Sequence, residues 1–304
     1  MAGEFELTSP REKASRPRRG GWSWGPVEGV RLRTLSLGGG IQSTTMALMA
    51  AHGEIDGPMP DQALYAPVDD AEATREHIRW LASGNVLPFP VEELPEAEVP
   101  MLQSIRNRVS GNGERYVSIP FHLDGPKQGM DRRQCTREYK VDRLNKAQRE
   151  ALGFKPRARI PAGSVEVWIG YSTDEVVRAG AAFETWAVNR FPLLEKRMSL
   201  GDCIAWLERH GYPVPPRSKC RRCPFREDAE WRWLQENEPE SFAEACEIDR
   251  LIRDTPGMRA KSYLHKSRQP LDQIDFSTAA ERGQGMLMLC DGDCGCLLYT
   301  SDAA

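Results

Sequence analysis

The sequence predicts an α/β protein with a doubly wound, mainly parallel sheet and a helical, cysteine-bearing C-terminal lobe. Strand-like and helix-like segments alternate, which is typical of a parallel sheet with helices on both faces. A glycine-rich turn joins the first strand to the first helix, and most of the eight cysteines follow residue 200. In such a fold, ligands bind at the carboxyl ends of the strands, where the glycine-rich turn would lie.

The first strand is expected over residues 30–37 and the first helix over residues 43–52. This helix is apolar almost all round and therefore buried, and Gly53 ends it. The other expected elements are a strand over 62–68, an amphipathic helix over 70–83, a weaker strand with prolines over 86–91 and a strand over 165–171.

Length and composition set the class of protein. The chain has 304 residues, of which 40% are hydrophobic, and its net charge of −3 provides no bulk attraction to nucleic acid or membrane. It contains neither an apolar run of about 18 residues nor an apolar signal core. We therefore expect a cytoplasmic protein without a membrane partner, whose cysteines are reduced thiols or metal ligands.

Four segments are predicted from composition and pattern. Residues 1–26 are polar and lack periodicity, so we expect a disordered tail, and residues 297–304 read as a non-native tail. Residues 27–196 form the predicted α/β domain, which contains the glycine-rich turn. Residues 197–296 form the predicted helical lobe with a cysteine cluster.

The turn that follows the first strand has the composition of a phosphate-binding loop. Three glycines precede hydroxyl side chains, so backbone N–H groups and the helix dipole can meet at one oxyanion. A Walker loop is excluded because the turn has no lysine, and a dinucleotide fingerprint is excluded because Ser43 stands where its third glycine belongs. A β-to-α turn without a ligand is the alternative.

The end of the 165–171 strand carries a second polar segment. Gly170 lets the chain turn, Ser172 or Thr173 can cap the next short helix, and Arg178 projects one turn further on. Asp174 and Glu175 are either part of the site or acidic residues that satisfy a helix N-terminus.

Residues 125–160 form a basic segment. They contain eleven Lys and Arg against four Asp and Glu, a local charge of 11 − 4 = +7. The segment is either a solvated helical face or a wall that receives a phosphorylated or sulfated substrate. Among so many cations, we expect a lowered pKa for the thiol of Cys135.

The cysteines predict a metal centre. Cys220 and Cys223 form a C-x-x-C pair followed by proline, as in iron–sulfur loops. We favour a [4Fe–4S] cluster on Cys135, Cys220, Cys223 and either Cys290 or Cys294, with a Zn²⁺ knot as the alternative. Helical spacing predicts that Cys203 is a core residue, and Cys246 is expected to be one as well.

Together these motifs resemble the phosphoadenosine phosphosulfate reductase family in its broad sense, within the PP-loop ATP pyrophosphatase superfamily. The resemblance covers residues 35–295 and rests on Gly38-Gly39-Gly40-Ile41-Gln42-Ser43, Arg133-Gln134-Cys135-Thr136-Arg137, the 168–178 segment, Phe191-Pro192-Leu193, residues 220–225, Leu264-His265-Lys266-Ser267 and the Cys290/Cys294 turn. Gly38 and Gln42 replace the usual serine and aspartate of the loop. The family implies a Rossmann-like fold of the adenine-nucleotide alpha-hydrolase type.

The resemblance also implies roles for individual residues. The implied nucleotide-binding residues are Ser36, Gly38, Gly39, Gly40, Gln42, Ser43, Thr44, Gly170, Ser172, Asp174, Glu175 and Arg178. The implied substrate-binding residues are Arg133, Arg137, Lys140, His265 and Lys266. Cys290 and Cys294 are the candidate catalytic thiols, and Cys135, Cys220, Cys223 and Cys290 are the candidate metal ligands.

Three functions follow from this sequence. The first is thiol-dependent reduction of an adenylyl sulfate, with a thioredoxin-like electron donor. The second is ATP-dependent adenylation and sulfur transfer with Mg²⁺ and a [4Fe–4S] cluster, in which the 125–160 segment would face a nucleic acid. The third is a non-catalytic module that binds nucleotide and nucleic acid and holds a structural zinc.

Overall fold

A computed structural model describes residues 19–125, 129–215, 217–256, 258, 260–278 and 281 of the chain. These residues form two compact units, which are described separately. Unit 1 contains residues up to Val68 together with Glu72–Ala97 and Arg137–Ser218. Unit 2 contains Asp69–Ala71, Glu98–Thr136 and the residues from Lys219 onward. No helix among the described residues has the length and apolar character needed to span a membrane.

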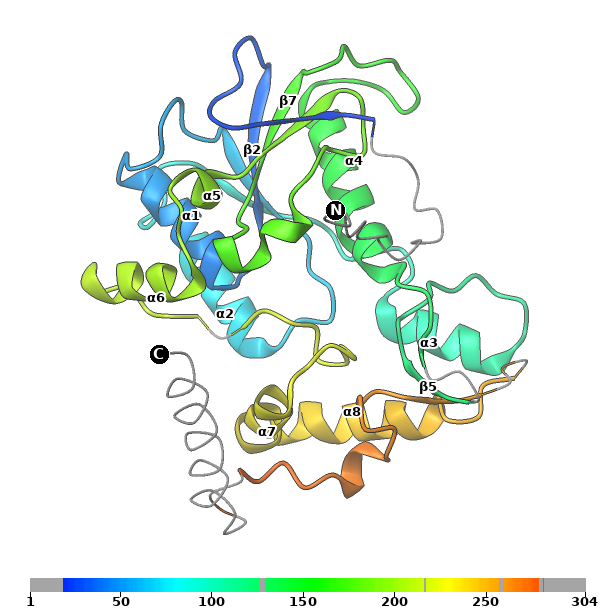
Figure 1. Ribbon diagram of the computed structural model, residues 1–304. Coiled ribbons are helices and arrows are strands. Elements are labelled where there is room, and N and C mark those ends of the chain that lie inside the picture. Colours follow the sequence, from blue (N-terminus) through cyan, green and yellow to red (C-terminus); the bar gives the residue numbers. More distant parts are fainter. Residues whose placement is uncertain are drawn as a thin grey trace, which may run out of the picture. The chain divides into compact units, whose positions relative to one another are not determined.

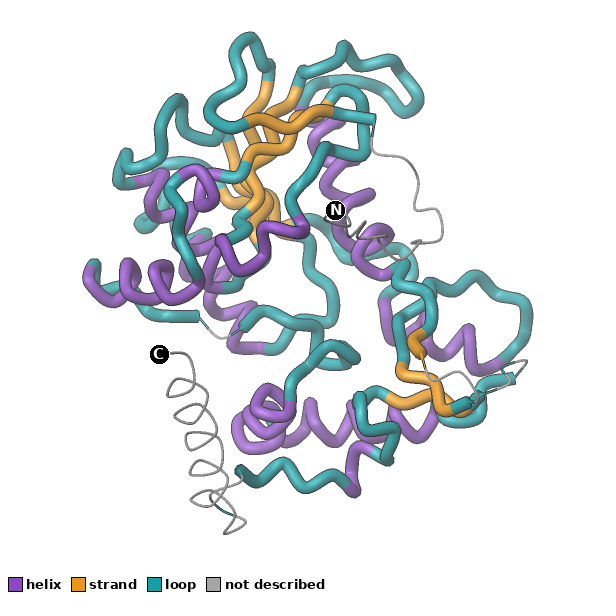
Figure 2. Tube along the Cα trace, in the orientation of Figure 1, coloured by secondary structure: helices purple, strands orange, loops and turns teal. Residues whose placement is uncertain are grey.

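Unit 1 is built on a six-stranded sheet in which every pair of neighbouring strands is parallel. The spatial order is β1-β8-β7-β2-β3-β4. Figure 1 labels the two central strands, β7 and β2, and Figure 2 draws the strands in orange. The strands are β1 (Gly21–Ser23), β2 (Leu32–Leu37), β3 (Gln62–Tyr65), β4 (Val91–Glu93), β7 (Val165–Ile169) and β8 (Ala187–Arg190). The predicted α/β fold with a parallel sheet is confirmed.

The strand order changes direction between β2 and β7. From β2 the chain adds β3 and β4 on one side, and it later adds β7 and β8 on the other. Ser36 in β2 pairs with Ile169 in β7, so both strands end at the same edge of the sheet. This point is the topological switch point, where open parallel sheets bind their ligands.

Helices cover both faces of this sheet. Leu35 and Leu37 of β2 pack with buried residues of α1 and α6 in one core cluster. On the opposite face, Thr34 of β2 accepts a hydrogen bond of 2.8 Å from the buried Gln148 of α4. The helices are α1 (Ile41–Ala51), α2 (Glu72–Leu81), α4 (Asp142–Ala151), α5 (Pro192–Glu195), α6 (Leu200–Arg209), the π-helix η1 (Arg137–Val141) and the 3₁₀-helix η2 (Thr173–Arg178).

A buried ion pair links β7 to β8. Arg190 and Glu166 are both fully buried, and Nη1 of Arg190 lies 3.3 Å from Oε1 of Glu166. Arg190 also pairs with Glu195 at 2.8 Å and donates to the carbonyl of Asp56 at 2.7 Å. The indole N–H of Trp168 donates to Glu166 at 2.6 Å, so the carboxylate has several donors.

Two expectations for unit 1 were wrong. The strand expected over residues 86–91 is β4, and it begins only at Val91. Proline has no N–H to donate to a strand ladder, so the strand forms after Pro90. The segment Gly21–Ser23, expected in a disordered tail over 1–26, is strand β1 and pairs with β8. The remainder of that tail up to residue 18 lies outside the described residues.

The described residues of unit 2 form three α-helices, one 3₁₀-helix and a small antiparallel sheet. The sheet has the order β6-β5-β9. Its core includes Asp249, whose carboxylate accepts the N–H groups of Leu264 at 2.7 Å and Leu271 at 3.1 Å. The elements are α3 (Met101–Ser110), β5 (His122–Asp124), β6 (Gly129–Met130), α7 (Asp228–Asn237), α8 (Pro239–Leu251), β9 (Lys261–Tyr263) and η3 (Leu271–Gln273).

The units differ from the predicted division at residue 197. Helix α6 belongs to unit 1 because its buried residues, among them Cys203 and Leu207, pack into the α1 core. Residues 98–136, which were expected in the α/β domain, belong to unit 2. The predicted cysteine turn, with Cys290 and Cys294, lies outside the described residues, as does the predicted tail over 297–304.

Candidate functional site

The turn between β2 and α1 contains three consecutive glycines and leads into a helix start without a side-chain cap. Gly39 has a φ of +71°, and a Cβ there would lie 2.8 Å from Cγ2 of Thr74. Gly40 is the N-cap of α1 but has no side chain, and the first turn of α1 contains no acidic residue. The first turn of α1 therefore supplies no carboxylate of its own to the positive end of the helix dipole.

Two serines hold this turn. The hydroxyl of Ser43 accepts the N–H of Gly38 and donates to the carbonyl of Gly40, both at 3.2 Å. Ser218, which no motif identified, donates its hydroxyl to the carbonyl of Gly38. The turn is thus fixed by local bonds as well as by a residue from the far end of unit 1.

Gly170 brings the end of β7 against the start of α1. A Cβ on Gly170 would lie 3.0 Å from the amide nitrogen of Ser43 and 3.2 Å from the carbonyl carbon of Gln42. The predicted loop residues and the predicted strand-end residue therefore meet at the switch point between β2 and β7. Gly38, Gly40, Gln42, Ser43 and Gly170 are half-buried, whereas Gly39 is buried.

Gln42 connects the turn to the strand-end segment. Its amide nitrogen donates to a carboxylate oxygen of Glu175 at 3.2 Å. Arg178 pairs with the other oxygen of Glu175, and its guanidinium lies 4.6 Å from the ring centre of Tyr171. Glu175 is therefore the carboxylate that reaches the turn.

Asp174 has a different role in the structure. Its carboxylate accepts the N–H of Leu200, the first residue of α6, at 2.6 Å and the hydroxyl of Ser172 at 3.1 Å. These hydrogen bonds lower the pKa of Asp174. Ser172 is fully buried and makes no side-chain cap for η2. Both side chains therefore serve the contact between the strand end and α6.

Thr44 turns its side chain away from the turn. It is fully buried, and its hydroxyl lies 2.9 Å from Nε2 of His77 in α2. Its N–H donates to the carbonyl of Gly40 within the helix. Burial lowers the pKa of His77 to about 4, so this ring is neutral at pH 7. The geometry gives Thr44 a packing role, in place of the implied contact with a nucleotide.

Unit 2 brings three of the predicted metal ligands together. The N–H of Cys223 donates to the carbonyl of Cys220 at 3.1 Å, which closes the C-x-x-C turn. Arg226, unforeseen from the sequence, is buried, and it donates to the carbonyl of Cys220 while its charge interacts with both thiols of the pair. Cys135 is close enough to Cys223 for the two thiols to interact electrostatically.

The expected lowering of the pKa of Cys135 was wrong. Burial of this thiol raises its pKa, and the opposing effect of Arg133 is smaller. Arg133 places its guanidinium 4.8 Å from the ring centre of Phe225 and donates a hydrogen bond to Thr136 at 3.2 Å. Cys203 and Cys246 are buried, as expected for core residues, and burial raises their pKa values to about 12 and about 11.

Among the described residues, the three cysteines Cys135, Cys220 and Cys223 are not a group whose sulfurs all lie within 4.8 Å of one another. For comparison, a tetrahedral zinc with Zn–S bonds of ~2.3 Å holds its sulfurs about 4 Å apart.

Asp69, which follows β3 in the chain, contacts the two arginines of the C-x-x-C turn. Its backbone has a φ of +47°, and its carboxylate pairs with Arg221 at 3.1 Å and with the buried Arg222. Its carbonyl accepts the N–H of Arg221 at 2.8 Å. The two arginines between the cysteines therefore have a structural use.

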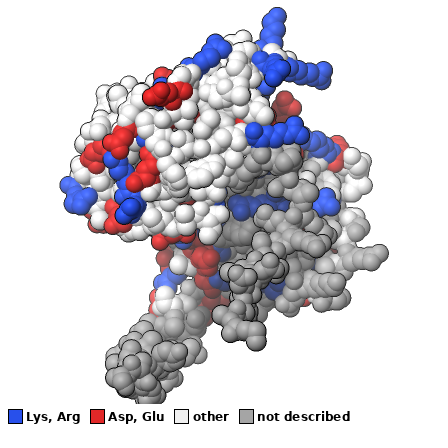
Figure 3. All heavy atoms as spheres, turned by 45° about the horizontal axis from the view of Figure 1, so that its top comes forward, with Lys and Arg blue, Asp and Glu red and all other residues white. Residues whose placement is uncertain are grey.

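The basic segment over 125–160 belongs partly to each unit, and several of its arginines have partners inside unit 1. Arg137 pairs with Asp142 at 3.3 Å, and Arg143 donates to the carbonyls of Pro67, Tyr139 and Pro95. Lys140 is half-buried in η1. The face drawn in Figure 3 carries Lys and Arg together with Asp and Glu.

His265 and Lys266, implied to bind substrate, contact the first residues of α7. Lys266 pairs with Glu227 at 3.0 Å and with Asp228 at 2.8 Å, which raises the pKa of Lys266. His265 is buried, lies 3.3 Å from Asp228 and has a lowered pKa because of burial. Both side chains therefore already interact with acidic residues of the protein.

The comparisons with known proteins add no family to this geometry. No protein-family model, no curated protein and no solved structure matches the chain.

Proposed function

We propose that the turn between β2 and α1 binds the anionic end of an adenine nucleotide and that the chain is an enzyme of sulfur metabolism. One observation carries the proposal: the glycine turn, the uncapped start of α1 and Gly170 meet at the topological switch point of a parallel sheet. A phosphate or sulfate there would accept backbone N–H groups and lie at the positive end of a helix dipole.

The proposed reaction is the thiol-dependent reduction of an adenylyl sulfate. A thiolate from Cys290 or Cys294 attacks the sulfur, an S–S bond forms, and the S–O bond to the nucleotide breaks, so that the adenosine phosphate leaves. A dithiol donor of the thioredoxin class then attacks the enzyme sulfur, is oxidised to a disulfide and releases sulfite. The resemblance to the phosphoadenosine phosphosulfate reductase family supports this reaction.

A second candidate is ATP-dependent adenylation followed by sulfur transfer to a nucleic acid. The approach of Cys135 to the Cys220–Cys223 pair favours it. These thiols, with Cys290 or Cys294 as the fourth ligand, would hold a [4Fe–4S] cluster, whose chemistry would be to carry a sulfur delivered by an external sulfur donor to the adenylated acceptor, where it displaces AMP. Carboxylates are preferred Mg²⁺ ligands, and Glu175 lies beside the turn where ATP would bind.

One experiment separates these reactions. The protein, purified without oxygen, is incubated with an adenylyl sulfate and a dithiol, and in parallel with ATP, Mg²⁺ and tRNA as the test acceptor. Sulfite release supports the reductase, and pyrophosphate release with thiolated RNA supports the second candidate. Nucleotide binding without either product would leave only a non-catalytic binding module, and absence of nucleotide binding would overturn the proposed site.

A further inference from the structure

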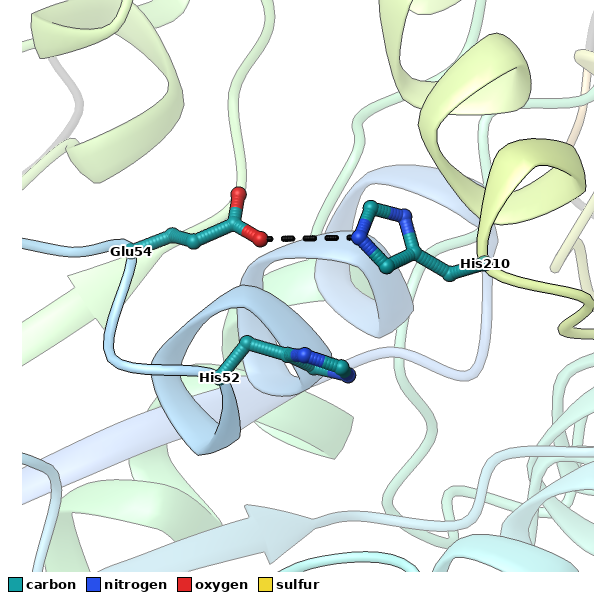
Figure 4. A group of neighbouring side chains, drawn as sticks. All are labelled: His52, Glu54 and His210. Atoms are coloured by element: carbon teal, nitrogen blue, oxygen red, sulfur yellow. Dashed lines mark ion pairs between the residues drawn. The ribbon is translucent and has the colours of Figure 1, made fainter.

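Two histidines and a glutamate converge at one point of unit 1. The ligand atoms of His52, Glu54 and His210 all lie within 4.8 Å of one another. Among the described residues, no other group of three His, Cys, Asp or Glu side chains meets this criterion. Figure 4 shows Glu54 and His210 facing each other, with His52 beside them.

Two helix ends bring these side chains together. His52 is the C-cap of α1, and His210 is the C-cap of α6, which packs against α1. Gly53 has a φ of +71°, and the N–H of Glu54 returns to the carbonyl of Met49 at 2.9 Å. The chain therefore reverses at the end of α1 and presents His52 and Glu54 on the same side as His210.

Neighbouring groups orient each of the three side chains. Nδ1 of His210 lies 2.8 Å from the carbonyl of Trp206, which leaves Nε2 at 3.6 Å from Oε1 of Glu54. The indole N–H of Trp206 donates to the other oxygen of Glu54 at 2.9 Å. Nε2 of His52 lies 2.9 Å from the hydroxyl of Tyr212, so Nδ1 is the nitrogen left for a ligand. Such outer hydrogen bonds fix the ring orientation and tautomer of metal-binding histidines.

The electrostatics of the location favour a cation. The C-terminal end of a helix carries a partial negative charge, and two such ends meet here beside a carboxylate. An ion pair between Glu54 and a protonated His210 would use only two of the three groups. His52, whose ring centre is 5.1 Å from that of His210, would have no part in that ion pair.

We propose that His52, Glu54 and His210 bind a divalent transition metal of the zinc class. Imidazole nitrogen and carboxylate oxygen suit Zn²⁺, and three protein ligands leave a position open for water. The side chains of His210 and Glu54 are 29% and 38% exposed, so an ion can reach them from solvent. This inference does not depend on the proposed nucleotide site or on the cysteine cluster.

The test counts bound zinc in the full chain by equilibrium dialysis. Because thiolates also bind zinc, the informative quantity is the difference between wild type and variants. We expect His52→Ala and His210→Ala each to lose one equivalent and Glu54→Gln to bind that equivalent at least about tenfold more weakly. Glu208→Gln, an exposed acid on α6, is the matched control and should keep it.

Two further measurements test whether the histidines themselves bind the zinc. Trp206→Phe removes the N–H that orients Glu54 and should weaken zinc binding by about 10-fold to 100-fold. Side-chain NMR signals of two of the five histidines should shift on addition of zinc and stay unchanged in the His52→Ala and His210→Ala proteins. Equal zinc content in wild type, Glu54→Gln and the histidine variants would overturn the proposal.

Discussion

Gly170 leaves only 3.0 Å between the position of its missing Cβ and the amide nitrogen of Ser43. We therefore expect Gly170→Ala to push the start of α1 away from the end of β7. The shift should weaken nucleotide binding at least tenfold and cost on the order of 1–3 kcal/mol of unfolding free energy. Calorimetric titration and urea unfolding measure the two effects. Gly201→Ala, in α6 with only its own Ser199 nearby, is the control and should raise stability by about 0.5–1 kcal/mol.

Gly39 should not tolerate a side chain, because the added Cβ would collide with helix α2. A Cβ there would lie 2.8 Å from Cγ2 of Thr74, and the φ of +71° disfavours any side chain. Gly39→Ala should therefore lower stability, and Thr74→Ala in the same chain should restore part of the loss, as measured by thermal melts. At Gly38 the nearest atom to a Cβ is 3.8 Å away, so Gly38→Ala should fold normally. Equal losses at Gly38 and Gly39 would contradict this explanation.

The cysteines of unit 2 should determine metal content. We expect Cys135→Ser, Cys220→Ser and Cys223→Ser to lose iron and the absorption near ~400 nm of anaerobically purified protein. Cys246→Ala is the control, because this cysteine is buried in the core and should leave the iron content unchanged. Wild-type protein that carries zinc alone would remove the cluster from the proposal.

His77 should make stability depend on pH. Its pKa of about 4 in the folded protein lies below the usual 6.5, because burial disfavours the charged ring. The unfolded chain therefore binds a proton more readily, and stability falls as the pH decreases from about 6.5 towards 4. This contribution amounts to about 3 kcal/mol. Urea unfolding of wild type and His77→Gln between pH 7 and pH 4.5 measures this effect. The variant should lose less unfolding free energy over this range than the wild type, and an equal loss in both proteins would contradict the prediction.

The buried pair between Arg190 and Glu166 should be costly to break. Arg190→Met removes the fully buried arginine that pairs with both Glu166 and Glu195 and leaves Glu166 with Arg33, whose Nε lies 3.4 Å away, and we expect a loss of about 3–5 kcal/mol in unfolding free energy. Arg79 and Glu72 form a pair with both side chains more than half exposed, so Arg79→Met should change stability little. Chemical denaturation of the two variants side by side tests the contrast.

The sequence predicted those parts of the fold that have a local pattern. The segment that became α1 is apolar almost all round, and β2, β3 and β7 are short segments rich in apolar residues that lie between turns, so they were recognisable. Strand β1 has three residues, Gly21–Ser23, with no periodicity, and it exists because β8 lies beside it. The membership of α6 in unit 1 likewise depends on its packing with α1 and not on its own composition.

For the candidate site, the sequence predicted which residues lie near one another, but not the hydrogen bonds and burial around them. The glycines and Gly170 were located from motifs, and the structure brings them together. The hydrogen bond from Ser218 to Gly38 crosses 180 residues and has no sequence signal. The pKa of Cys135 was misjudged because nearby arginines are visible in a sequence, whereas burial is not.

The interleaving of the two units limits how the protein can be dissected. The chain passes from one unit to the other at residues 68/69, 71/72, 97/98, 136/137 and 218/219. No single cut can release either unit whole, and a fragment that starts at residue 219 would lack Asp69, the anion that pairs with Arg221 and Arg222. Truncation products should therefore be misfolded, and genetic complementation with separated halves should fail.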